Sequence, residues 1–293
     1  MSGIANRRAL LASGLAAAVF AASGVPVRAS GVRGGALRAG LGGASLADGW
    51  DGASHDGLFM RAVGAGAVFD TLTEVAADGT LRGELAVEWE PTEGARIWEI
   101  ALRDGVRFHD GGPLVAADVV ETYSRRLGTD GPLSGVAEIS ALDRLRLRLV
   151  LTEADPDLPY RLSDPRLIVP RGGVPGPVGT GLYRVAGFEP GRSFTGRRVA
   201  EHWKDGRAGW FERVEVLALD PAEVRLAALR SGRVDAAAGL GLHAVGMLRA
   251  GGGHRVDEVD GWVQAVSDRV GLPAVLGPGP MDDARFLERW WAA

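Results

Sequence analysis

The alternating segment from Arg144 to Leu151 constrains the fold of this chain more than any other feature. Every second residue is leucine, and the residues between are mostly arginine. The leucines are Leu145, Leu147, Leu149 and Leu151, and the arginines are Arg144, Arg146 and Arg148. A period of two places alternate side chains on opposite faces of a strand. This segment therefore predicts a half-buried strand with one solvent-facing side.

Helical patterns are interspersed with further strand patterns. Apolar residues at helical spacing predict a helix over 116–127, which Gly128 ends. Asp220 has the properties of an N-cap for a second helix, with Pro221 at its first position and Gly232 at its end. Four other segments favour strands: 35–41, 96–103, 182–185 and 214–219. The mixture predicts the α/β class with a mixed sheet.

The first 29 residues have the three-part pattern of an export signal. Arg7 and Arg8 precede a weakly apolar stretch over 12–22, and Val27-Arg28-Ala29 resembles a cleavage site. The paired arginines favour the twin-arginine route, which carries folded cargo. The alternative is an ordinary secretory signal that contains two arginines. In either case we expect an exported protein, and the apolar stretch is too short to span a bilayer, which takes ~20 residues.

Composition excludes several function classes. The sequence has no cysteine, which excludes disulfides, thiolate metal sites and a lipid anchor on an N-terminal cysteine. Its net charge of −4, with no basic cluster, argues against a nucleic-acid partner. It lacks a Gly-x-Ser-x-Gly elbow and a phosphate-binding loop. We therefore predict no catalytic residues, no metal site and no cofactor.

Several short motifs occur in a characteristic order along the chain. They are LAVEW at 85–89, IALRDGVRFHDG at 100–111, ADVV at 117–120, GTGLY at 179–183 and ALRSGRVD at 228–235. Together they resemble the family 5 extracellular solute-binding proteins of ABC importers, which include oligopeptide, dipeptide and nickel-binding proteins. The segment 283–292 (DARFLERWWA) resembles the C-terminus of members with a similar start.

The resemblance implies a periplasmic-binding-protein type II-like first lobe of mixed sheet, with the second lobe largely absent. It assigns residues 1–29 to the signal and 30–235 to the first lobe. A Gly/Ala-rich junction over 236–261 then replaces the second lobe, because about 25 residues are too few for a domain. Residues 262–293 form a C-terminal segment returning to the first lobe.

The loop after the first strand is expected to border the ligand cleft of such a lobe. It carries the candidate substrate-binding residues Ser45, Trp50, Asp51 and His55. The alternative is a solvated loop without ligand contact. His109 beside Asp110 is interpreted as part of a turn, with its ring hydrogen-bonded to the backbone. The aromatic pair His202-Trp203 is interpreted as part of a structural turn.

The resemblance implies a soluble periplasmic substrate-binding component of an ABC transporter. Its partners would be a peptide or similar small hydrophilic solute and an inner-membrane permease. Because half of the usual clamp is absent, we expect weakened solute affinity. The alternative is an interaction module that retains the first-lobe fold and docks on a permease or another binding protein. Self-association through the face left by the missing lobe belongs to the same expectation.

Overall fold

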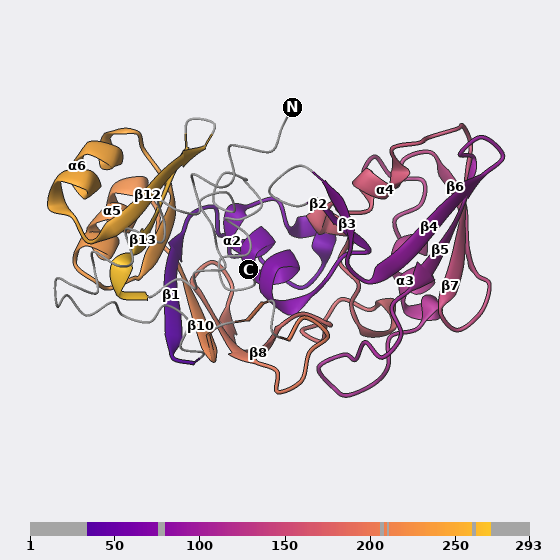
Figure 1. Cartoon of the computed structure of the whole chain (residues 1–293), viewed down its shortest axis with the longest axis horizontal. Helices are drawn as coiled ribbons and strands as arrows, with labels where there is room; N and C mark the ends of the chain where they lie inside the picture. Colours follow the sequence, from indigo (N-terminus) through magenta and orange to yellow (C-terminus); the bar gives the residue numbers. More distant parts are fainter. Residues whose placement is uncertain (1–33, 76–79, 206–207, 210, 260–261, 271–293) are drawn as a thin grey trace, which may run out of the picture.

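The computed structural model describes residues 34–75, 80–205, 208–209, 211–259 and 262–270. This part of the chain is elongated, with a large sheet at one end and a smaller antiparallel sheet at the other (Figure 1). The export signal predicted at 1–29 lies outside the described residues, as do 271–293 with the motif at 283–292.

The larger sheet has seven strands among the described residues, in the order β12-β13-β11-β1-β10-β9-β8. They are β1 (Ala36–Leu41), β8 (Tyr183–Glu189), β9 (Ser193–Arg198), β10 (Arg213–Ala218), β11 (Ala236–Leu240), β12 (His254–Val259) and β13 (Trp262–Ser267). Strand β1 runs parallel to β10 and β11, and the outer pairs are antiparallel. The predicted α/β class with a mixed sheet is confirmed.

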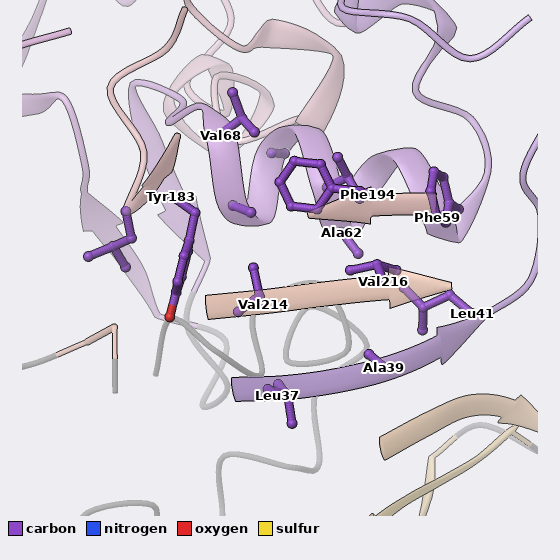
Figure 2. Close-up of a cluster of buried hydrophobic side chains, with 14 of the residues drawn as sticks. Leu37, Ala39, Leu41, Phe59, Ala62, Val68, Tyr183, Phe194, Val214 and Val216 are labelled. Carbon is purple, nitrogen blue, oxygen red and sulfur yellow. The ribbon is translucent and has the colours of Figure 1, made fainter. Parts of the chain in front are cut away.

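Helices cover both faces of this sheet. One face packs against α2 (Leu58–Met60) and the π-helical segment η2 (Arg61–Val68). In Figure 2, Phe59, Ala62 and Val68 lie over the strands that carry Leu41 and Val216. Many residues of η2 are alanine or glycine, so its backbone approaches the sheet closely.

The opposite face packs against α5 (Ala222–Arg230) and α6 (His243–Gly251). Side chains on β11 alternate between the two layers: Ala236 and Ala238 belong to the first core, and Ala237 and Leu240 to the second. All five residues of β11 are buried, as a central strand covered on both faces requires.

The smaller sheet has the order β4-β5-β7-β6 and is antiparallel throughout. Its strands are β4 (Ala86–Thr92), β5 (Ile97–Leu102), β6 (Val136–Ala141) and β7 (Arg146–Leu151), and α3 (Ala116–Ser124) packs on it. Leu147, Leu149 and Leu151 are buried in its core, while Arg146 and Arg148 pair with Glu99 on β5. The strand predicted from the Leu/Arg alternation is confirmed.

Short elements lie outside the two main sheets. They are β2 (Thr73–Val75), β3 (Leu81–Gly83), α4 (Leu158–Arg161) and the 3-10 turns η1 (Gly52–Ser54), η3 (Pro165–Leu167), η4 (Arg171–Gly173) and η5 (Asp268–Val270). Strands β2 and β3 pair antiparallel. Residues 76–79, between these two strands, lie outside the described residues.

A buried ion cluster connects the ends of the molecule. The Lys204 ammonium, in the loop after β9, lies 2.9 Å from the Asp70 carboxylate and 2.7 Å from that of Glu84. Thr180 donates a hydrogen bond of 2.9 Å to Asp70. Because Asp70 follows η2 and Glu84 precedes β4, the cluster ties the larger sheet to the segment that enters the smaller one.

Two expectations differ from the structure at helix ends. The helix predicted over 116–127 ends at Ser124, and Arg125 is its C-cap. Asp220 does not cap α5, whose N-cap is Pro221. The Asp220 carboxylate instead accepts hydrogen bonds from the Gly43 backbone and the Arg225 guanidinium. Those tertiary partners take the oxygens that a cap would have offered to the helix.

The range 236–261, predicted as a junction, is largely occupied by regular structure. It contains β11, α6 and β12, all within the larger domain. Its small residues have a packing role, since the alanines of β11 fit between two covering layers. Positive φ angles at Gly252 and Gly253 turn the chain from α6 into β12. Strand β13 then pairs with β11 inside the same sheet.

Candidate functional site

An open cleft of about 540 Å³ lies between the two ends of the molecule. One wall comes from the region between β1 and η2, through His55, Asp56 and Arg61. The other wall comes from the smaller domain, which is built on the sheet β4-β5-β7-β6. It contributes the loop before β6 and the segment from α4 to η3. Residues far apart in the sequence therefore meet here, and the cleft has the size of a small-molecule site.

Charged side chains of both signs line this cleft. Arg161 and Arg166 supply positive charge, and Asp56 and Asp164 supply negative charge. Arg166 holds Asp164 in a two-point contact, with nitrogen–oxygen distances of 2.9 and 2.8 Å. Tyr160, with 48% of its surface exposed, adds a ring with a hydroxyl. Such a lining suits a ligand that carries both charges on a short skeleton.

The Asp164 carboxylate is held ionised by its neighbours. Burial alone would raise its pKa, but hydrogen bonds from the Arg166 side chain and backbone outweigh it, and the pKa lies below its usual value. Arg161 is fixed by Asp155 at 3.1 Å and by the backbone carbonyl of Ser134 at 2.9 Å. The smaller-domain wall is therefore preorganised.

His55, a predicted site residue, forms part of this cleft. Its side chain is only 1% exposed, and its Nε2 donates to the Gly49 carbonyl at 3.1 Å. Burial, opposed only in part by that hydrogen bond and Asp51, lowers the pKa of His55. The ring packs against the α-carbon of Gly64 in η2. His55 thus supports the cleft wall as a neutral, anchored ring.

The other three predicted site residues lie outside the cleft lining. Asp51 caps η1 by accepting from the Ala53 backbone and pairs with Arg126 at 2.8 Å. Trp50 packs on Phe188, with ring centroids 4.5 Å apart, and so helps to anchor the loop to the core. Ser45 is exposed, and its hydroxyl accepts a hydrogen bond from the Ala47 backbone.

The histidines interpreted as structural are bound to the backbone. His109 Nε2 donates to the Gly181 carbonyl at 2.8 Å, which confirms the predicted turn with a backbone-bonded ring. His202 Nε2 donates to the Thr180 carbonyl at 2.8 Å, and its ring stacks on Trp203. Both rings thus secure the Gly179–Gly181 segment against neighbouring loops.

The part of the chain that the structure describes carries neither a cluster of metal-ligating side chains nor a membrane-spanning helix. No group of three or more His, Cys, Asp or Glu side chains there is arranged to hold a metal ion. None of its helices is long and apolar enough to cross a bilayer.

Comparison with known families decides the classification. The model of the bacterial extracellular solute-binding proteins, family 5 (Middle), matches residues 80–285, which is more than half of the chain. The chain belongs to this family. Its resemblance in ordered motifs is thereby confirmed, and family 5 proteins are transport components that bind solutes for ABC transporters.

Individual relatives are distant. The uncharacterized protein YhjP of Bacillus subtilis is 32% identical over 152 residues, 49% of this chain and 26% of YhjP. The probable peptide ABC transporter periplasmic-binding protein y4tO of Sinorhizobium fredii is 27% identical, over 58% of this chain and 37% of its own. The chain thus spans less than two-fifths of either relative.

Solved structures share the fold. The periplasmic binding protein AgaA of A. tumefaciens R10, solved with agropinic acid, superposes with a TM-score of 0.68 and 25% identity. The match covers 76% of this chain and 47% of AgaA. The family 5 protein described here therefore has the fold of one part of such binding proteins.

Sequence reasoning missed most of the cleft. Arg161, Arg166 and Asp164 carry no motif, and each has an ordinary structural interpretation beside Pro165. They join His55 only because the region before α2 packs against η3. A signal restricted to neighbouring residues does not contain that contact.

Proposed function

We propose that this family 5 protein binds a peptide or a similar small hydrophilic solute and delivers it to an ABC permease. The observation that carries the proposal is the open cleft of about 540 Å³, lined by charges of both signs. Opposed charges at Arg161, Arg166, Asp56 and Asp164 complement the amino and carboxyl groups of a short peptide. The name of the relative y4tO supports the same ligand class.

Affinity is expected to be weak for the chain described here. In this superfamily architecture a ligand is enclosed when a second lobe closes over the cleft and excludes water. The cleft in this structure is open on one side, so a ligand would keep part of its hydration.

Thermal unfolding in the presence of ligands tests this proposal. The full chain is mixed at millimolar concentration with a di- and tripeptide library, with Ni²⁺–histidine complexes and with sugars. A ligand that binds the native state must raise the melting temperature. Asp56→Asn should reduce the shift, and Asp130→Asn, an exposed residue outside the cleft, should not. The absence of any shift across the library would contradict direct binding.

We also propose export through the twin-arginine route to the periplasm. The support is the pattern of Arg7-Arg8, the weakly apolar stretch and Val27-Arg28-Ala29. Replacing both arginines by lysine should retain an uncleaved precursor in the cytoplasm, because the receptor reads the pair. Export of the double variant at the normal rate would favour the ordinary secretory route instead.

A second candidate is an interaction module, and one observation favours it. Leu46 is 85% exposed and follows β1, while Leu242 is 54% exposed and follows β11. Because β1 and β11 are parallel neighbours, the two leucines emerge at the same end of the sheet. Exposed apolar residues at one edge are typical of contact surfaces.

Sedimentation of the full chain distinguishes this candidate. If the surface mediates self-association, the wild type forms a dimer that Leu46→Ser with Leu242→Ser dissociates. Val174→Ser, at an exposed apolar residue outside this end of the sheet, is the matched control. A concentration-independent monomer would rule out self-association.

A further inference from the structure

A second cavity, separate from the cleft, lies where the larger sheet meets the turn before α3. Its volume is about 330 Å³, at the lower end of the range for small-molecule sites. Arg184 of β8 belongs to its lining. Its lining shares no residue with that of the cleft.

Positive charge converges on this cavity. Arg107 enters from the turn before α3, Arg184 from β8 and Arg198 from the end of β9. Asp205 neutralises Arg198. The Arg184 side chain forms no hydrogen bond or ion pair with any described residue, and the Arg107 guanidinium donates to the Gly111 carbonyl at 3.0 Å. Glu201 is the one acidic residue of the lining.

Two neutral imidazoles with fixed orientation, His109 and His202, also line the cavity. The Nε2–H groups of His109 and His202 donate hydrogen bonds to the carbonyls of Gly181 and Thr180, respectively. The Nδ1 atom of His109 is buried and has no hydrogen-bond partner among the described residues. Because the carbonyl oxygens of Gly181 and Thr180 already accept hydrogen bonds from the rings, they repel a bound anion less.

The positive charge of Arg184 acts on the His109 ring. Burial is the largest cause of the lowered pKa of His109, and the charges of His202 and Arg184 lower it further, while Asp70 acts in the opposite direction. The Arg184 side chain, which has no ion-pair partner among the described residues, therefore acts electrostatically on a buried ring of the same cavity lining.

From this arrangement we propose that the cavity binds a compact oxyanion, a carboxylate or phosphate group, between Arg107 and Arg184. Guanidinium groups bind such oxyanions by paired, charge-assisted hydrogen bonds. A cavity of this volume favours a small ligand over a macromolecular partner, which would place its contacts on a broad open face. The whole chain has a net charge of −4, so the local excess of positive charge at this cavity is opposite in sign to the charge of the molecule.

The test uses inorganic phosphate and acetate as probes, titrated at constant ionic strength with NaCl into the full-length chain. The expected result is a saturable rise in the pKa of His109, followed by NMR of the imidazole proton, because a bound anion offsets the field of Arg184. Saturation by phosphate alone identifies a phosphate site, and saturation by both identifies a general oxyanion site.

Arg184→Gln should weaken binding at least about tenfold, since a hydrogen bond to a charged group has that worth. Arg192→Gln, in the turn after β8 and outside the cavity, is the matched control and should leave binding unchanged. Arg107→Gln gives a second variant if Arg184→Gln fails to fold. A non-saturable response equal to that of chloride, or equal affinity in folded Arg184→Gln, would overturn the proposal.

Discussion

Three histidines share one environment at the residue scale. His55, His109 and His202 each donate from Nε2 to a backbone carbonyl and are largely shielded from water. Burial is the largest cause of the lowered pKa at all three. Each ring is thus neutral in the folded protein at pH 7, and acid must charge a group with little solvent around it.

The pH dependence of stability follows from that lowering. Below about pH 6.5, the usual histidine pKa, the unfolded chain binds more protons than the folded one. The free energy of unfolding should therefore be constant above this pH and fall as the pH decreases toward the lowered pKa. Each histidine contributes at most about 1.4 kcal/mol per pH unit. Urea unfolding between pH 7.5 and 5 measures the slope.

Replacing one of these histidines measures its contribution to the pH dependence of the free energy of unfolding. His55→Gln keeps a donor for the Gly49 carbonyl and removes the titration, so the slope between pH 6.5 and 5 should become shallower. Equal slopes in wild type and His55→Gln would show that His55 does not titrate differently on folding.

At the scale of the element, the two faces of β7 contribute differently to stability. Leu149 is fully buried, and Arg148 on the other face pairs with Glu99 while 41% of its side chain is exposed. Leu149→Ala should lower the free energy of unfolding by about 2–5 kcal/mol, because it leaves a cavity. Arg148→Ala should cost less than about 1 kcal/mol, because solvent screens the pair. Chemical denaturation of both variants measures the contrast, which similar losses would contradict.

Two glycines in helical segments predict opposite effects of the same substitution. A methyl group at Gly64 in η2 would overlap the His55 ring, so Gly64→Ala should destabilise by about 1–3 kcal/mol. Gly246 in α6 has open space where its side chain would be and a negative φ angle. Gly246→Ala should stabilise by about 0.4–1 kcal/mol. Melting temperatures that move in the same direction would refute the contact-based explanation.

Periodic elements were accessible from sequence, and their ends and partners were not. The alternation in β7 follows directly from its side chains, whereas α3 ends at Ser124, before the Gly128 that the sequence offered as its stop. Asp220 has the chemistry of a cap, but Arg225 and Gly43 take its oxygens in the folded chain. Small residues over 236–261 suggest a junction, although in the sheet they are what a doubly covered strand needs.

At the scale of the whole molecule, the ordered motifs predicted the family, and the cleft depended on tertiary contact. His55, in the loop expected to border the ligand, lines the cleft, and its part in ligand binding stays a prediction. Ser45, Trp50 and Asp51 are in the same loop, and their contribution to binding stays a prediction. The charged partners across the cleft come from the smaller domain, more than 100 residues further along the chain. Only the packing of two domains brings those groups together.

The ion cluster of Lys204 with Asp70 and Glu84 links those domains. Lys204→Met would leave two carboxylates buried without their cation, since Asp70 is 5% and Glu84 1% exposed. The expected loss in the free energy of unfolding is about 3–5 kcal/mol. Arg144→Met, which breaks an exposed pair with Asp104, is the control and should cost less than about 1 kcal/mol.

Chemical labelling of Lys204 is a second, independent test of the ion cluster. Lys204 is the only lysine in the sequence, so an amine-reactive ester has one side-chain target. Burial and pairing should make Lys204 react much more slowly in the native chain than in urea, with the α-amino group as internal reference. Adding Glu84→Gln to Lys204→Met removes one of the orphaned charges and should recover part of the lost stability. Fast native labelling, or a double variant no more stable than Lys204→Met, would show that the cluster does not hold the domains together.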